Sequence, residues 1–167
     1  GAFGLAPGAK ILPIRMPKAG RAANQAAGDK RLNESLTKAI KYAVDRDAQV
    51  INVSMGVSTA SEELAEAVKY ALERGALVFA AVGNSGGGAN SVEYPAGTPG
   101  VVGVAAVGKD LRRTEESQFG AQVDLAAPGD EMIHACGGET GFCESHGTSD
   151  ATALASASAA LIWSKYP

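Results

Sequence analysis

A serine and an asparagine stand in the two stretches of this chain best suited to chemistry on a carbonyl group. Ser149 lies in SHGTSD (145–150), and after Asp150 the next thirteen residues carry no charge. Asn84 lies in AVGNSG (81–86), with glycine close on both sides. A serine hydroxyl attacks a carbonyl once a base removes its proton, and N–H donors must then stabilise the developing oxyanion. Ser149 at a helix start could offer its own N–H, and the Asn84 amide could be the second donor.

Each stretch also has a purely structural interpretation. Serine and threonine commonly cap helices, and Gly-Asn-Ser-Gly is a common turn sequence. The chemical interpretation therefore depends on whether the fold brings Ser149 and Asn84 to the same place.

Apolar runs alternate with helical patterns and indicate the elements that would position these loops. A polar stretch over 20–33 is expected as a surface excursion, and residues 33 to about 47 then carry apolar side chains at helical spacing. A second helix is expected between a capping box, formed by Thr59 and Glu62, and Gly75 at its C-terminal end. The buried stripe of this second helix would be Leu64, Ala67, Val68, Ala71 and Leu72. Strands are expected over 9–16, 49–54, 76–82, 100–108 and 122–129.

The alternation of strands and helices predicts an α/β fold with a parallel sheet that is buried on both faces. In such sheets the binding cleft lies at the carboxyl ends of the strands. Those ends carry SMG (54–56), AVGNSG (81–86) and, beyond the last strand, SHGTS (145–149). Topology therefore predicts that the three stretches meet at one edge of the sheet.

Composition excludes several classes of function. The chain has 46% hydrophobic residues and a net charge of −3, from 15 Lys and Arg against 18 Asp and Glu, so neither disorder nor a nucleic-acid partner is expected. No apolar run approaches the roughly 18–20 residues that span a bilayer, so no membrane segment is expected. The chain begins at Gly1 without an initiator Met, and we interpret it as a processed product or a fragment of a longer protein.

Two cysteines, Cys136 and Cys143, lie seven residues apart in a glycine-rich loop. A disulfide there would stabilise the fold by roughly 2–3 kcal/mol and would indicate an oxidising compartment. Two unpaired thiols are the alternative. A metal site with His134 and His146 is a third possibility, but the spacing matches no familiar zinc pattern.

The order of the motifs resembles that of the subtilisin-like serine proteases, or subtilases, over essentially the whole chain. The matching stretches are GLAPGAKILPIRM (4–16), VINVSMG (50–56), VFAAVGNSG (78–86), YPAGTPGVVGVAAV (94–107), VDLAAPG (123–129) and HGTSDATALASASAALI (146–162). The resemblance implies a three-layer subtilisin-like fold, with residues 1–167 as part of one catalytic domain. It also implies a serine endopeptidase that acts on polypeptides through an acyl-enzyme, with no cofactor.

The resemblance assigns roles to individual residues. Ser149 would be the nucleophile and Asn84 the side-chain donor of the oxyanion hole. One wall of the substrate pocket would be Ser54, Met55 and Gly56, which would also bind the substrate backbone as an added strand; the opposite wall would be Ala81, Val82 and Gly83. For Met55, core packing is as good an interpretation as substrate contact. The walls are too small and too neutral to predict which side chains are preferred.

The family's catalytic aspartate and histidine precede the stretch that matches 4–16, so the resemblance places both upstream of Gly1. His146 stands in an H-G-T, as the family's histidine does, but it is three residues from Ser149 on the same turn and is rejected as the base. His134 has no better claim, and Asp124 is interpreted as a structural residue at a strand end. We therefore expect this chain alone to be inactive, with a separate N-terminal part as a possible partner. The family's calcium sites rest largely on upstream segments, so we expect no metal site in this chain. The resemblance also implies a secreted protein or one on the outer side of the cell envelope.

Two other functions compete with the peptidase. A pseudoprotease or binding module would keep the fold and lose the chemistry, but it would not require Ser149 and Asn84. A nucleotide-binding domain using GNSGGG (83–88) lacks the G-K-[ST] and G-x-G-x-x-G patterns. The family commonly has an apolar residue at the position of Asp150. A carboxylate in the first turn of a helix interacts favourably with the helix dipole and stabilises the helix by about 0.3–1 kcal/mol. Alternatively, Asp150 faces the leaving-group side and favours basic residues there.

Overall fold

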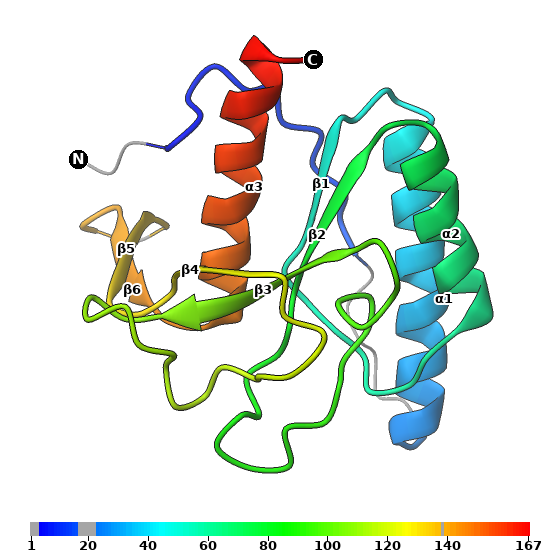
Figure 1. Cartoon of the computed structure of the whole chain (residues 1–167), viewed down its shortest axis with the longest axis horizontal. Helices are drawn as coiled ribbons and strands as arrows, with labels where there is room; N and C mark the ends of the chain where they lie inside the picture. The colour runs from blue at the N-terminus through cyan, green and yellow to red at the C-terminus, as the bar shows by residue number, and fades with distance from the viewer. Residues whose placement is uncertain (1–3, 17–22, 138) are drawn as a thin grey trace.

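Four parallel strands form the central sheet of the computed structural model, which describes residues 4–16, 23–137 and 139–167. Their order across the sheet is the order in the chain: β1 (Val50–Val53), β2 (Leu77–Ala81), β3 (Val102–Val107) and β4 (Leu125–Pro128). Helices α1 (Gln25–Val44) and α2 (Glu62–Glu73) cover one face, and α3 (Thr148–Lys165) covers the other (Figure 1). This arrangement confirms the predicted three-layer α/β fold with a mainly parallel sheet.

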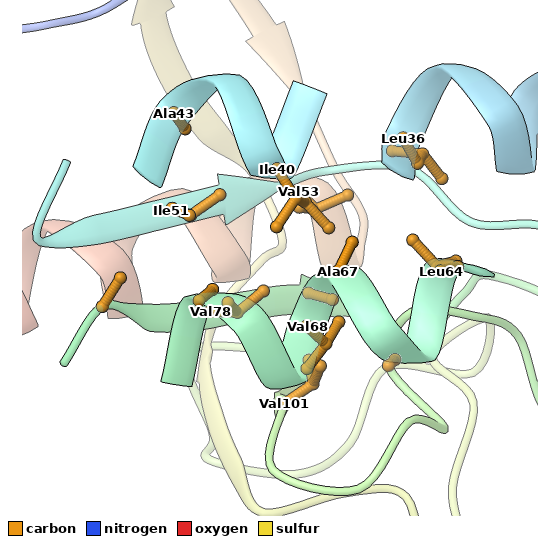
Figure 2. Packing of buried hydrophobic residues seen from close by; sticks show 14 of the residues in the cluster. Leu36, Ile40, Ala43, Ile51, Val53, Leu64, Ala67, Val68, Val78 and Val101 are labelled. Carbon is orange, nitrogen blue, oxygen red and sulfur yellow. The ribbon is translucent and has the colours of Figure 1, made fainter. Parts of the chain in front are cut away.

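The core has one part on each side of the sheet. The larger part packs aliphatic side chains of α1 and α2 against β1 and β2 (Figure 2). The smaller part, beneath α3, consists mainly of small residues: Phe79, Val104, Ala106, Ala127, Ala151 and Ala155. Because alanine side chains are short, α3 can lie close to the ends of β1 to β4 and hold its first turn against them.

Helix α1 begins at Gln25, so the surface excursion predicted for 20–33 was wrong from that residue on; residues 20–22 lie outside the described ranges. Asn24 starts the helix, since its side-chain oxygen accepts a hydrogen bond of 2.9 Å from the N–H of Ala27. In the first half of α1 the buried residues are polar, namely Asp29 and Asn33. A buried face made of polar residues hides the apolar period that sequence analysis relies on.

Asp29 is the buried residue that connects α1 to the loop after β1. Its Oδ2 accepts hydrogen bonds from Ser58 Oγ (2.6 Å) and Thr59 Oγ1 (2.8 Å), and its Oδ1 accepts one from Gln25 Nε2 (2.7 Å). The bond from Ser58 is the main reason that the pKa of Asp29 is lowered. Asp29 thus fixes the segment that follows residues 54–56.

Replacing Asp29 by alanine should lower the free energy of unfolding by about 1–3 kcal/mol, because the hydrogen bonds that this buried carboxylate accepts from Gln25, Ser58 and Thr59 are lost. Because the pKa of Asp29 is lower in the folded protein than in the unfolded chain, the ionised carboxylate stabilises the fold fully at pH values above its unfolded-state pKa. That stabilisation is lost as the pH falls through the folded pKa, so the gap between the wild type and Asp29→Ala should close in acid. Urea denaturation at several pH values measures this gap. Glu34→Ala, at an exposed position of the same helix, is the control, and an equal effect there would contradict the assignment.

Two further local predictions were wrong. Residues 9–16 form no strand: Pro13 cannot donate a ladder hydrogen bond, and Ile11 is 80% exposed, while only Ile14 and Met16 pack against the core. The N-cap of α2 is Ser61, whose Oγ accepts from Leu64 N–H at 3.3 Å, instead of Thr59.

The remaining features of α2 mostly match expectation. Gly75 follows the helix with φ +78°, a left-handed conformation that suits glycine at a helix end. The predicted stripe is buried at Leu64, Ala67, Val68 and Ala71, but Leu72 is 36% exposed and lies over Gly100 at the rim. Strands β1 to β4 lie within the ranges predicted for 49–54, 76–82, 100–108 and 122–129.

An antiparallel hairpin that sequence analysis missed joins β4 to α3. It consists of β5 (Met132–Ala135) and β6 (Phe142–Ser145), and a disulfide between Cys136 and Cys143 closes it. Its side chains are largely exposed, so no alternating pattern marks these strands in the sequence. Of the three alternatives for the cysteines, the structure has the disulfide. Among the described residues, no group of three metal-binding side chains gathers, and no helix has the length and apolar character to cross a bilayer.

Candidate active site

Ser149 is the second residue of α3, where the helix begins at the carboxyl edge of the sheet (Figure 1). The N–H of Gly147 donates to the carbonyl of Gly129 at 2.8 Å, which ties the helix start to the end of β4. Ser149 Oγ donates to the carbonyl of Ser54 (3.1 Å), and Ser54 Oγ donates to the carbonyl of Ser149 (3.0 Å). The Ser149 N–H, in the first turn, has no partner within the helix. The hydroxyl is thus held beside the end of β1, next to a backbone N–H that donates to none of the described residues.

Asn84 is oriented by the residue before Ser149. Its Oδ1 accepts two hydrogen bonds from Thr148, one from the N–H and one from Oγ1, both at 2.9 Å. Thr148 is fully buried and its Oγ1 also accepts from the N–H of Gly83 (3.3 Å). Because Thr148 donates both hydrogen bonds to Oδ1, the amide nitrogen Nδ2 of Asn84 points away from Thr148, and it donates to no described residue. A Cβ on Gly147 would lie 3.1 Å from this nitrogen, so glycine leaves the amide its space.

Ser149 and Asn84 line the same cavity, which has a volume of about 300 Å³. Four residues predicted as pocket walls line it as well: Met55, Gly56, Ala81 and Gly83. The predicted convergence of the three strand-end stretches on one edge is therefore observed. Met55 is 37% exposed, so it is no core residue.

The two other predicted wall residues do not line the cavity with their side chains. Ser54 lies beside it, in the reciprocal hydrogen bonds with Ser149. Val82 is fully buried in the core, and its N–H donates to the carbonyl of Val104 (3.2 Å). A larger depression of about 700 Å³ shares Asn84 with this cavity and extends over the charged segment 110–116, but Ser149 is not among its lining residues.

Sequence reasoning missed three cavity residues, Ser85, Glu93 and Thr148. Thr148 precedes Ser149 and Ser85 follows Asn84 in the sequence, so their proximity to the predicted residues was the signal that could have found them. Glu93 reaches the cavity because Val57 and Tyr94 exchange two backbone hydrogen bonds, at 2.9 and 2.8 Å, which bring residue 93 against Gly56. No sequence pattern reports that pairing.

Neither histidine of the chain contacts Ser149. His146 is exposed, and its Nδ1 lies 2.7 Å from Glu116 Oε1, a hydrogen bond that raises the pKa of His146. His134 Nδ1 lies 3.1 Å from Ser145 Oγ. Asp124 accepts from the N–H of Gly103 at 2.8 Å and pairs with the same residue through its own N–H, the strand-end role expected of it. In the described residues, the Ser149 hydroxyl is therefore positioned by the carbonyl of Ser54 and has no hydrogen bond to a histidine or carboxylate side chain.

Asp150 lies in the first turn of α3 and accepts a hydrogen bond from Ser145 Oγ at 2.7 Å. This contact and the helix dipole agree with its structural interpretation.

The whole chain matches one known family. The family model described as "Subtilase family" covers residues 1–167. Halolysin of Haloferax mediterranei is 49% identical over 126 residues, which are 75% of this chain and 24% of halolysin. Subtilisin DY of Bacillus licheniformis is 32% identical over 169 residues, covering 100% of this chain and 58% of that protein. The chain therefore spans only part of the length of the curated relatives it matches.

Solved structures give a similar result. The prenylagaramide maturation protease PagA superposes with a TM-score of 0.73 at 32% identity, over 79% of this chain and 49% of its own. The PatG macrocyclase in complex with peptide superposes with a TM-score of 0.78 at 26% identity, over 96% of this chain and 46% of its own.

Proposed function

Because this chain belongs to the subtilase family of serine proteases, we propose that it is the serine-bearing part of an endopeptidase with Ser149 as nucleophile. Ser149 Oγ would bond to the carbonyl carbon of the scissile peptide while its proton passes to a base. The tetrahedral intermediate would then expel the amine, which takes up that proton and leaves an acyl-enzyme for water to hydrolyse. The proposed oxyanion donors are the Asn84 amide and the Ser149 N–H. The observation that carries this proposal is that Ser149 and Asn84 line one cavity, with Thr148 orienting the amide.

The general base is proposed to come from outside this chain. The sequence contains two histidines, and neither hydrogen-bonds the Ser149 hydroxyl. The matched relatives are longer than this chain. Following the motif order of the family, we assign the aspartate and histidine of the triad to an upstream segment, either continuous with this chain or held as a separate piece. A polypeptide is the proposed substrate.

An oxidising, extracellular compartment is proposed as the place of action, either in free solution or at the cell envelope. The disulfide between Cys136 and Cys143 supports it, because such bonds persist where thiols are not kept reduced.

Labelling with a fluorophosphonate probe tests the peptidase against a pseudoprotease. The probe reacts with a serine that a base activates, so the protein that contains the upstream segment should label at Ser149, whereas the 167-residue chain alone should label far more slowly. Intact mass before labelling identifies which species is present. A protein with the upstream segment that never labels would favour a binding module.

Asp150 provides a test on the leaving-group side. If it only stabilises α3, Asp150→Ala should leave the ratio of cleavage before Lys and before Glu within about twofold, while helix stability falls by about 0.3–1 kcal/mol. Peptides that differ only in the first residue after the scissile bond measure this ratio. A ratio that drops about tenfold in the variant would assign Asp150 to substrate selection instead.

A further inference from the structure

The cavity beside Ser149 has a carboxylate between its two walls. Glu93 is half-buried and lines the cavity together with Ser149 and Asn84. A Cβ built on Gly56 would lie 2.5 Å from Glu93 Oε2, and one built on Gly83 would lie 2.6 Å from Glu93 Oε1. Gly56 and Gly83 come from the opposite walls, so the carboxylate occupies space that exists because both walls lack a side chain.

Neutral groups hold Glu93 in this place. Gln118, which is fully buried, donates from Nε2 to Glu93 Oε1 at 2.9 Å and to Ser85 Oγ at 2.8 Å. In the described residues, Oε2 of Glu93 accepts no hydrogen bond. One oxygen of the carboxylate is therefore fixed, and the other is available to a ligand.

The charge of Glu93 has no partner in the described part of the chain, where no Lys, Arg or His nitrogen forms an ion pair with it. The charge that influences it is another carboxylate, Asp29 of α1. Burial raises the pKa of Glu93, Asp29 raises it further, and the bond from Gln118 acts in the opposite direction. A partly buried anion without a counter-charge is costly, and a cation that enters the cavity would remove that cost.

We propose that Glu93 makes this cavity a binding site for a lysine or arginine side chain, so that the peptidase cleaves after basic residues. The inference rests on the proposed function, because it takes the substrate residue whose carbonyl faces Ser149 and Asn84 to insert its side chain here. The aliphatic stem of that residue would pass between Met55 and Ala81, and its charged end would meet Glu93 Oε2.

Cleavage of a peptide series tests this specificity. The peptides differ only in the residue before the scissile bond, which is arginine, lysine or norleucine, the last being a lysine-like stem without the charge. The protease with its upstream segment should show a kcat/KM for lysine and arginine about 10–100-fold above that for norleucine. Glu93→Gln keeps the shape of the side chain and the acceptor for Gln118, and it should bring the ratio of lysine to norleucine cleavage to within about threefold of one.

The matched control is Glu66→Gln, which removes the same charge from an exposed position of α2. This variant should keep the full preference. A wild type that cleaves after norleucine as well as after lysine, or a Glu93→Gln variant that retains the preference, would overturn the proposal.

Binding without catalysis separates this inference from the peptidase function. Product-like peptides that end in lysine or norleucine can be titrated into the Ser149→Ala protein by calorimetry. Tighter binding of the lysine peptide, by about 10–100-fold and dependent on Glu93, would support the site even if no peptide is ever cleaved. Equal binding would refute the site even if the protease is active.

The pH dependence of the preference gives another readout. The charged or titratable group that influences Glu93 is Asp29 from α1, while the contacts from the segments around Ser85 and Gln118 are neutral. Since the pKa of Glu93 is raised, the lysine-to-norleucine ratio should fall as the pH is lowered through that pKa, whereas Glu93→Gln should show a flat ratio. A wild-type lysine-to-norleucine ratio that does not change as the pH is lowered would contradict a charge-based preference.

Discussion

Replacement of Ser149 by alanine is expected to lower kcat of the protease by about 10⁶-fold, which is the magnitude seen for loss of the nucleophile in subtilisin, a member of the same family. The reason is chemical: without the Oγ no acyl-enzyme can form, and only oxyanion stabilisation and binding remain. The structural effect should be small, because the reciprocal bond from Ser54 Oγ to the carbonyl of residue 149 does not involve the lost hydroxyl. Peptide hydrolysis and fluorophosphonate labelling together measure the change.

A second serine on the same helix serves as the control for this variant. Ser158 is exposed and donates back to the carbonyl of Leu154, so Ser158→Ala should retain wild-type activity and labelling. Unfolding of both variants can be compared to exclude a loss of fold. An alanine variant at 149 that keeps more than a tenth of the activity would show that the nucleophile lies elsewhere.

The sheet and its functional edge could be predicted because their signals are local. Strands β1 to β3 are nearly continuous apolar runs, as strands covered on both faces must be, and parallel order then places their ends together. The position of the Asn84 loop follows from that order, whereas Ser149 reaches the same edge through the hairpin of β5 and β6, which leads into α3. The first half of α1 could not be predicted in this way, since its buried residues Asp29 and Asn33 are polar and both bond to the segment Ser58–Thr59, more than twenty residues away.

Sequence analysis predicted residues from the two walls of the cavity but missed the carboxylate between them. The stretches 54–56 and 81–83 adjoin strand ends, so their position is a consequence of topology. Glu93 reaches the same space through the pairing of Val57 with Tyr94 and through the absence of side chains at Gly56 and Gly83. These are contacts between distant segments, and neither periodicity nor composition reports them. Glu93, the one charged side chain among the described residues that line the cavity, therefore could not be predicted from the sequence, and neither could the preference now proposed.

Asn84→Ala is expected to lower kcat by about 10²–10³-fold with little change in KM, which is again the magnitude seen in subtilisin when its oxyanion-hole asparagine is removed. An oxyanion exists only after the hydroxyl has attacked, so the donor stabilises the transition state more than the bound substrate. The Asn84 geometry agrees with this role, because both bonds from Thr148 go to Oδ1 and leave Nδ2 free in the cavity that Ser149 also lines. Separate determination of kcat and KM on one peptide measures the effect.

The alanine variant also removes the acceptor of the buried Thr148 hydroxyl, at a cost of about 1–3 kcal/mol in stability, so loss of activity alone would be ambiguous. Asn84→Asp resolves this, since a carboxylate still accepts from Thr148 but cannot donate from the position of Nδ2. If donation to the oxyanion is the function of Asn84, Asn84→Asp should be at least as slow as Asn84→Ala while its fold is better preserved. Thr148→Val loses the hydroxyl that orients the amide but keeps the backbone bond to Oδ1, so its kcat should fall much less. An aspartate variant with near-normal kcat, or a loss confined to KM, would mean that this amide supports the structure of the cavity and takes no part in the reaction.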